Sequence, residues 1–485
     1  MMKMKKIYVL ILAALACVSC NDWLDVQPST QIEKDKAIES TQGFRDILIG
    51  AYIRLKSPAL YGKELTWGSV EYLAQHWETD QKETGPFQLS QYTYYEKSAL
   101  SATGNMFNNL YKAIADVNGI LDVIDEKQSM LVNGNYELIK GEALAIRAYC
   151  HFELLRLFGP MPGKDIPQST ILPYVKSVSR KINTHLTYAE YTKQLLADLD
   201  QAQQYLEKVD LILKYNLKEL NLQSGYQLKE PDMFFAYRQM RMNYYAVLAQ
   251  KARVYLWLND KPAALENAQK VIGAKDKKGE LIYALGSKGE MEAGDYSLSN
   301  EHILALTNHS LSDANWRKTQ DAFYTLKPKL ERYYSDTDIR LQLLWTEIVE
   351  NSIRKYHSKK YVQLEKSGTD ARNNWAKNAI PLIRLYEMYL IAMECSSLEE
   401  AANIWNNTLS VMRDEEKVAG FNSKEQLENL LIMEYNREFY AEGQAFYAYK
   451  RLGRETIIGS PKAANADVYV IPLPSQEFTG INTGN

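Results

Sequence analysis

The sequence feature that most constrains the fold is a pair of helical segments separated by a break of only a few residues. One face of the first segment, which begins near Asn243, carries apolar residues at the spacing of helical turns: Leu248, Ala252, Tyr255 and Leu256. Asn259-Asp260 then interrupts the pattern, and Pro262 falls in the first turn of the second segment, where its missing N–H costs no helical hydrogen bond. The range 243–272 is therefore predicted to be a helical hairpin of the tetratricopeptide type.

The same pattern recurs at 384–410, where a turn at Ser396-Ser397 separates two helical stripes. Either Ser396 with Glu399 or Ser397 with Glu400 can form a capping box for the second helix of this pair. Further helices are expected at 38–56, 106–126, 137–158, 187–206 and 424–451, and four long segments have weak pattern: 57–105, 207–237, 275–335 and 352–380. The sequence thus predicts an all-α fold, a tetratricopeptide-like helical hairpin scaffold with long irregular loop excursions that carry the ligand site.

The N-terminus has the pattern of a bacterial lipoprotein signal. Three lysines, at positions 3, 5 and 6, precede an apolar run from Ile7 to Ala16, which is well short of the roughly 20 residues that a spanning helix needs. Small residues precede both Cys17 and Cys20, and the polar stretch that begins at Asn21 favours Cys20 as the lipid-attachment residue. We therefore expect a signal peptide at 1–19, a lipidated tether at 20–34 and a single helical domain at 35–485.

Charge and motifs narrow the functional classes. The formal net charge is −3 and becomes −6 without the three lysines of the signal, and no dense Lys/Arg tract suited to polyphosphate is present. Nucleic acid is therefore not an expected partner. The sequence also has no G-x-S-x-G elbow, H-E-x-x-H pair or phosphate-binding G-x-x-x-x-G-K-[ST] loop. Only Cys150 and Cys395 lie in the mature body, and whether they form a disulfide stays open.

Six fragments, in order along nearly the whole chain, resemble the SusD/RagB-like family. They are 20–28 (CNDWLDVQP), 141–149 (GEALAIRAY) continuing to Gly159 and Pro162, 243–272, 383–392 (IRLYEMYLIA), the charged stretch 434–453 and 471–477 (IPLPSQE). One departure is Tyr447-Ala448-Tyr449, where the family often has an acidic residue before a basic pair. The resemblance implies a binding lipoprotein at the surface of the outer membrane of Bacteroidetes-type bacteria, without enzyme activity or cofactor. It would capture oligosaccharide, or less readily peptide, and deliver it to a SusC-like TonB-dependent transporter barrel.

Aromatic side chains in the irregular segments are the candidate ligand contacts. A sugar ring presents apolar C–H faces and hydroxyl edges, so a glycan receptor needs flat aromatic platforms beside polar partners. The chain has 34 Tyr and 8 Trp against 12 Phe, a bias toward aromatics that carry a polar group. Since the family's ligand contacts come from its early and middle excursions, we expect the rings there to face solute. The candidates are Trp67, Tyr72, Trp77, Asp80, Tyr92, Tyr94, Tyr296, Asn315, Trp316 and Arg317. For each of them, packing within its own loop is the competing interpretation.

Three carboxylates near the C-terminus require separate consideration. Glu434, Glu438 and Glu442 are spaced i, i+4 and i+8 and would share one helix face, where Arg437 is the nearest neutralising residue. A carboxylate-bridged metal centre in a helical bundle would need Glu-x-x-His pairs, and no histidine lies in this stretch. We interpret the three as a structural charge network. Whether a calcium ion binds elsewhere, in the Asp-containing loops, stays open.

Two other functions remain open. A surface hydrolase that cleaves glycan or peptide is one, because a glycosidase carboxylate pair is defined by its separation in space and not by sequence spacing. A purely structural assembly lipoprotein, whose hairpins bind only protein partners, is the other. Turnover by the purified protein would identify the first, and association with a barrel without ligand binding would identify the second.

Overall fold

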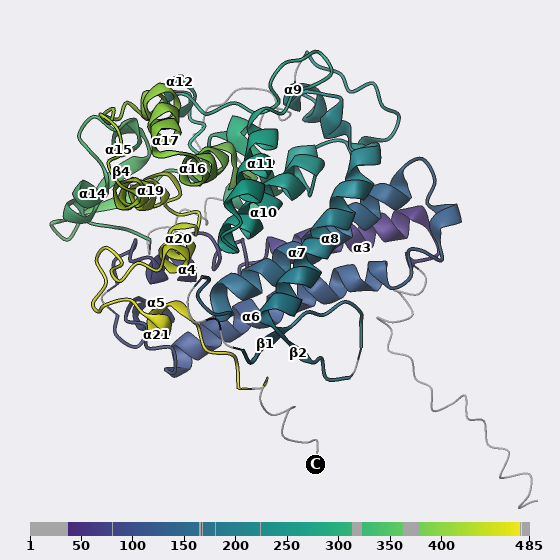
Figure 1. The fold of residues 1–485 in the computed structure, drawn as a ribbon, viewed down its shortest axis with the longest axis horizontal. Coiled ribbons are helices and arrows are strands. Elements are labelled where there is room, and N and C mark those ends of the chain that lie inside the picture. The colour runs from purple at the N-terminus through teal and green to yellow at the C-terminus, as the bar shows by residue number, and fades with distance from the viewer. Residues whose placement is uncertain are drawn as a thin grey trace, which may run out of the picture.

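The computed structural model describes residues 37–475 and 477, except for 80, 164, 165, 167, 180, 224, 313–322 and 362–377. Within these ranges the protein is chiefly helical and its strands form three two-stranded sheets, so the predicted all-α fold is confirmed. Figure 1 shows the long helices of the first half of the chain side by side, with the helices of the C-terminal part gathered at the opposite side.

The first four long helices are α3 (Thr41–Leu55), α6 (Lys97–Leu121), α7 (Asn135–Phe158) and α8 (Tyr188–Val209). Each packs against the next in this order. The helix predicted at 106–126 begins earlier, at Lys97, and ends at Leu121. The prediction placed its start too late because the polar and small residues of the first turns show little apolar pattern. The capping box predicted for α8 is confirmed, since Thr187 accepts from the Glu190 N–H and the Glu190 carboxylate accepts from the Thr187 N–H.

The predicted hairpin consists of α10 (Tyr244–Trp257) and α11 (Lys261–Ile272). The Asn243 side chain caps α10, the Asp260 side chain caps α11, and Pro262 lies in the first turn of α11. α11 packs against α16 (Leu385–Cys395), which is followed by α17 (Leu398–Ile404), a π-helical turn at Trp405–Leu409 and α18 (Ser410–Arg413). Of the two proposed caps for α17, Ser397 is the one observed. The tetratricopeptide-like hairpins are thus confirmed.

The prediction of a single helix at 424–451 is wrong. The chain forms α19 (Lys424–Glu438) and α20 (Ala445–Leu452), because Ala441 and Gly443 between them adopt left-handed backbone conformations, with φ of 64° and 71°. The Glu71 carboxylate, from α4 (Ser69–Leu73), accepts hydrogen bonds from both of their N–H groups, at 2.9 and 2.7 Å. A buried tertiary contact therefore replaces the helical hydrogen bonds at this point.

The segments with weak pattern contain short elements packed on the core. The further α-helices are α5 (Gly85–Ser90), α9 (Leu217–Leu220), α12 (Lys288–Glu292), α14 (Lys327–Tyr333), α15 (Ile339–Leu343) and α21 (Ala466–Tyr469). Short 3-10 helices lie at Gln128–Met130, Leu211–Leu213, Met233–Phe235, Arg238–Met240, Ser299–Glu301 and His309–Ser312.

Three antiparallel strand pairs complete the described structure. They are β1 (Thr170–Pro173) with β2 (His185–Thr187), β3 (His302–Thr307) with β6 (Ala379–Arg384), and β4 (Trp345–Glu350) with β5 (Ile353–Ser358). β4 and β5 form a hairpin with a two-residue loop, Asn351-Ser352, in which both residues have positive φ, as the favoured turn of such loops requires. No helix in the described ranges is both long and apolar enough to cross a membrane. Cys150 and Cys395 are both free thiols.

Candidate functional site

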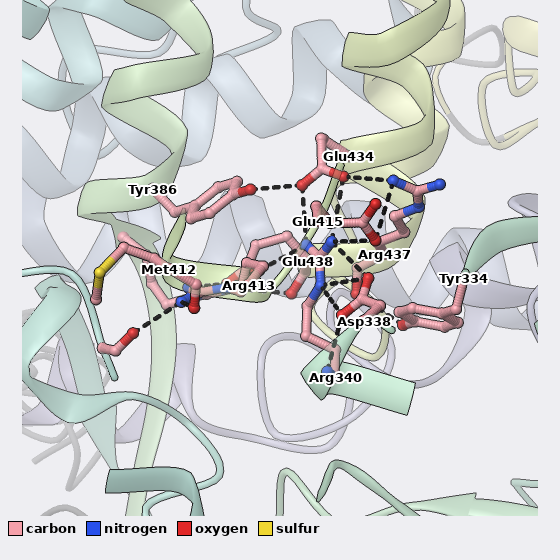
Figure 2. Close-up of polar contacts among 12 residues, drawn as sticks. Tyr334, Asp338, Arg340, Tyr386, Met412, Arg413, Glu415, Glu434, Arg437 and Glu438 are labelled. Carbon is pink, nitrogen blue, oxygen red and sulfur yellow. Dashed lines mark hydrogen bonds and ion pairs between the residues drawn. The ribbon is translucent and has the colours of Figure 1, made fainter. Parts of the chain in front are cut away.

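A network of buried charges joins α19 to other parts of the chain (Figure 2). Glu434 and Glu438 lie one turn apart on α19, and both accept from the Arg340 guanidinium, at 2.8 and 2.9 Å. Arg413 donates to both carboxylate oxygens of Glu438, at 2.9 Å each. All four side chains are almost fully buried. The carboxylates of α19 are therefore neutralised by arginines from α15 and α18.

Glu442 does not share the face of α19, because the helix ends before it; that part of the prediction is wrong. It nevertheless joins the same network, since it pairs with Lys360 and accepts from Arg384 Nε at 2.8 Å. Arg384 also binds Glu438 and Glu301, at 2.7 Å each. The three carboxylates thus meet through tertiary contacts and not through helical spacing.

The electrostatics of the network are those of a structural element. Burial by itself would raise the pKa of Glu438, but Arg413 and Arg384 hold it well below its usual value. The balance is similar for Glu434, where Arg340 and Arg437 outweigh burial and lower the pKa. Carboxylates that stay ionised and accept from several guanidiniums do not exchange protons near neutral pH. The ion pairs of Glu434, Glu438 and Glu442 confirm the predicted charge network. Among the described residues, no group of three or more His, Cys, Asp or Glu side chains is arranged to hold a metal ion.

The structure places the predicted aromatics of segment 57–77 inside the core. Trp67, Tyr72 and Trp77 are 1%, 5% and 3% exposed. The Trp67 ring packs 4.5 Å from that of Tyr361, and the Trp77 ring packs 5.0 Å from that of Tyr440. The expectation that these rings face solute is wrong, because the segment folds into helical turns whose aromatic faces are covered by protein. Direct contact of these residues with a ligand stays a prediction.

The other candidates are dispersed. Tyr296 is half-buried and lies 5.4 Å from the Lys359 ammonium, measured from the ring centroid. Tyr92 and Tyr94 line a common groove between segments 92–96 and 462–472, and Tyr296 does not line it. Five predicted site residues lie outside the described residues: Cys20, Asp80, Asn315, Trp316 and Arg317.

A groove with a volume of about 950 Å³ is formed by three parts of the chain that are far apart in sequence. Segment 92–96, between α5 and α6, forms one side; the chain just beyond α7 forms another; and segment 462–472, which includes α21, forms the third. Figure 1 shows α5 and α21 close together beside one end of α6. The groove therefore lies where the first and last parts of the described chain meet.

The floor of the groove is apolar, and the phenol groups of its two buried tyrosines are hydrogen-bonded to backbone carbonyls. Tyr92 has a left-handed backbone, with φ of 55°, and its phenol donates to the Leu73 carbonyl at 2.9 Å. The Tyr94 phenol donates to the Val468 carbonyl in the wall formed by α21. Burial raises the pKa of Tyr92 to about 12, so this phenol is neutral at physiological pH. The remaining floor is built from Phe158, Pro160, Met161, Ile171, Val470 and Pro472.

The rim of the groove is polar and exposed. Glu96, Lys462 and Asp467 are exposed residues of its lining, which gives the rim both signs of charge. Tyr95 is 82% exposed, so its ring is the one large aromatic surface that the described lining residues offer to solvent. An apolar floor beside a few polar groups is the usual composition of a small-molecule site.

Two smaller hollows are lined in part by elements that also line the groove. One, of about 490 Å³, shares Glu96 with it and is otherwise polar, with Gln88 and Ser101 in its lining. The other, of about 390 Å³, contains Pro173, from the same strand β1 that supplies Ile171 to the groove. The first hollow shares a lining residue with the groove, so a ligand of several linked units has room to extend into it.

Two models of known protein families match this chain. One family model, described as starch-binding associating with outer membrane, matches residues 22–215, and a second, described as SusD family, matches residues 345–472. The chain belongs to the SusD/RagB-like family. A curated SusD-like protein of Formosa agariphila is 22% identical over 213 residues, a match that spans 43% of this chain and 39% of that relative's length.

Several solved structures share the fold of this chain. A SusD superfamily protein of Bacteroides thetaiotaomicron is 21% identical, with a TM-score of 0.67 over 91% of this chain and 98% of that chain. A SusD-like carbohydrate binding protein of Bacteroides vulgatus is 17% identical, with a TM-score of 0.67 over 91% and 96% of the two chains. Surface glycan-binding protein A of Bacteroides uniformis is 17% identical, with a TM-score of 0.65 over 90% and 97%.

The two SusD/RagB-like matches together include the groove. The first contains segment 92–96 and the end of α7, and the second contains Lys462 to Pro472. The predicted ligand contacts Tyr92 and Tyr94 both line this groove, and the exposed Tyr95 beside them was not among the predicted contacts. Nothing in a run of consecutive tyrosines indicates which ring turns outward, although the polar pair that follows Tyr95 is a weak signal of exposure.

Proposed function

We propose that this protein is a non-enzymatic binding protein of the bacterial cell surface that captures oligosaccharide in the groove between segments 92–96 and 462–472. The observation that carries the proposal is the groove itself, with an apolar floor, an exposed tyrosine ring and a charged rim. The description of the first matching family model, starch-binding associating with outer membrane, supports the same ligand class and location.

The groove suits sugar rings for a physical reason. The C–H faces of a sugar pack on aromatic and aliphatic surface, and its hydroxyls bond to carboxylate and ammonium groups at the edge. Tyr95 supplies the exposed ring, and Glu96, Asp467 and Lys462 supply the polar edge. The hollow that shares Glu96 with the groove makes room for a chain of several sugars. A peptide also combines apolar and polar parts, so glycan and peptide libraries are screened together.

Tyr95→Ala is the variant that tests the site. Because the ring is 82% exposed, its removal leaves the core intact, and the loss of one aromatic contact worth about 0.5–1.5 kcal/mol weakens binding about twofold to tenfold. The matched control is Tyr226→Ala, at another exposed tyrosine, 41% exposed and outside the groove. Glycan-array screening of the chain from Asn21 onward gives the ligand, and calorimetry gives its affinity for the two variants. Equal affinities would place the ligand elsewhere.

We propose further that Cys20 carries the lipid anchor and that a SusC-like TonB-dependent transporter receives the captured ligand. Incorporation of labelled palmitate that is lost in Cys20→Ala tests the anchor. Co-purification with a large outer-membrane barrel tests the transporter. Association with a barrel without any measurable ligand would favour an assembly role, and turnover of glycan or peptide pools by the purified protein would replace the binding role by an enzymatic one.

A further inference from the structure

A small cavity of about 30 Å³ lies inside the protein where α7, α10, α16 and α20 meet. Three arginines line it, Arg156, Arg253 and Arg451, together with Glu387 and Trp257. About 10–15 Å³ is enough for one water-sized particle. The cavity therefore accommodates one or two such particles and is too small for phosphate, sulfate or a sugar.

Two of the lining arginines have an N–H group that finds no partner within the described part of the chain. Arg156 donates through Nη1 to Gln444 Oε1 at 3.1 Å and through Nη2 to Glu153, which leaves Nε. Arg253 donates through Nε to Glu387 at 2.6 Å and uses Nη2 as well, which leaves Nη1. These arginines are 4% and 5% exposed, so bulk water does not satisfy the two groups. Since a guanidinium has donors only, whatever binds to both must be an acceptor.

The charges around the cavity do not balance. Each lining arginine has one carboxylate partner: Glu153 for Arg156, Glu387 for Arg253 and Glu394 for Arg451. The fully buried Lys450 ammonium lies 6.0 Å from the ring centroid of Trp257 and bonds to three backbone carbonyls in place of a carboxylate. Three of these cations line the cavity and Lys450 lies beside it, so among the described residues this buried region holds four cations and three carboxylates. A net positive charge in the interior is costly unless an anion compensates it.

We infer that this cavity is a halide site, occupied by chloride under physiological conditions, in which the ion accepts hydrogen bonds from Arg156 Nε and Arg253 Nη1. A halide is monoatomic and fits the volume, carries the compensating negative charge, and has no hydrogens that would need acceptors of their own. Burial and the neighbouring Arg156 lower the pKa of Lys450, and a bound anion opposes that change by favouring the ammonium form. Its two donors lie on α7 and α10, so the ion joins these two helices at the place where they pack against α16 and α20.

Bromide is the probe. In crystals grown with sodium bromide, diffraction at the bromine absorption edge should give an anomalous peak inside the cavity, within hydrogen-bond distance of both free N–H groups. In solution, the melting temperature in sodium bromide should exceed that in sodium gluconate at equal ionic strength. Above the dissociation constant it should rise by roughly 1–2 °C for each tenfold increase in bromide. Equal melting temperatures in the two salts together with no anomalous peak would overturn the proposal and leave water as the occupant.

Gln444→Glu tests the charge argument directly. The variant keeps the shape of the side chain that accepts from Arg156 and adds the missing carboxylate, so the bromide dependence of the melting temperature should disappear. Gln426→Glu, the same substitution on the exposed surface of α19, should keep the full dependence. Bromide dependence that is unchanged in Gln444→Glu would contradict the site. Should this variant not fold, the diffraction and salt comparisons on the unaltered protein still decide the question.

Discussion

Replacing Glu438 by glutamine tests whether the buried charge network holds α19 in place. Glu438 is 2% exposed and accepts four hydrogen bonds from three guanidiniums, those of Arg340, Arg384 and Arg413, at 2.7–2.9 Å. Glutamine keeps the shape, but it removes the charge and turns an NH₂ group toward donors. Removal of one partner from a buried ion pair costs about 3–5 kcal/mol, because the remaining charges stay buried without compensation.

The expected change in melting temperature follows from the size of the chain. The entropy of unfolding is about 2.1 cal/mol/K per residue, which for 485 residues gives about 1 kcal/mol/K. A loss of about 3–5 kcal/mol therefore lowers the melting temperature by roughly 3–5 °C in differential scanning calorimetry. In urea, the midpoint should fall while the slope of the unfolding free energy stays constant, because the surface exposed on unfolding is the same.

Glu415→Gln is the matched control. Glu415 borders the same network, with guanidinium nitrogens of Arg437 and Arg340 at 3.5 and 3.7 Å. Burial, with a hydrogen bond to Asp338, raises the pKa of Glu415 to about 8, so this carboxyl is largely protonated at pH 7 and the neutral glutamine resembles it. We expect little change in melting temperature. If Glu438→Gln costs no more than Glu415→Gln at pH 7, the charge of Glu438 does not stabilise the fold and the reasoning is refuted.

Three further outcomes are expected. The stability that a protonated Glu415 contributes is complete below its unfolded pKa of about 4.3 and is lost as the pH rises through the folded pKa of about 8. The wild type should therefore lose stability relative to Glu415→Gln across this window in urea unfolding, and parallel pH curves would contradict this. Gly443→Ala should destabilise by about 2 kcal/mol or more, because its φ is positive and the new Cβ would lie 2.3 Å from the Leu65 carbonyl oxygen; an unchanged urea midpoint would refute it. Gly104→Ala, inside α6 with no atom within 4 Å of the new Cβ, should stabilise by about 0.5–1 kcal/mol, and a lower midpoint would refute that.

The hairpin α10–α11 could be predicted almost to the residue because its boundaries are determined locally. Asn243 and Asp260 accept from N–H groups in the first turns of their own helices, and Pro262 stands where no helical N–H is needed. These contacts lie within three residues of the cap, so the sequence contains the whole signal. The same holds for Thr187 with Glu190 at the start of α8.

The break between α19 and α20 could not be predicted in this way. The chain leaves the helix at Phe439 because Glu71, far away in the sequence, binds the N–H groups of Ala441 and Gly443. The apolar pattern continues across the break, since both helices face the same core. Only the glycine at position 443 marks it, and a glycine inside a helical pattern does not by itself locate a break.

The network and the groove show the same limit for long-range contacts. The sequence indicated that Glu434 and Glu438 need cations, but Arg340, Arg384 and Arg413 come from three different elements that only the fold brings together. The groove likewise combines segments from both ends of the chain. Residue type suggested aromatic contacts, but composition does not show which rings are buried. Most of the described candidate rings lie in the core.

Buried hydrogen bonds hold the walls of the groove in place. On one side Lys450 donates to the carbonyls of Arg156 and Gly159, at 2.7 and 2.8 Å, and so fixes the end of α7, whose continuation forms the floor. On the other side the buried Tyr94 phenol binds the Val468 carbonyl. Each of these bonds joins parts of the chain that are far apart in sequence, so we expect the groove to keep its shape without a ligand and binding to lose little conformational entropy. Under the proposed function, we expect ligand selectivity to come from the exposed rim, above all from Tyr95, which can change without any cost to the core.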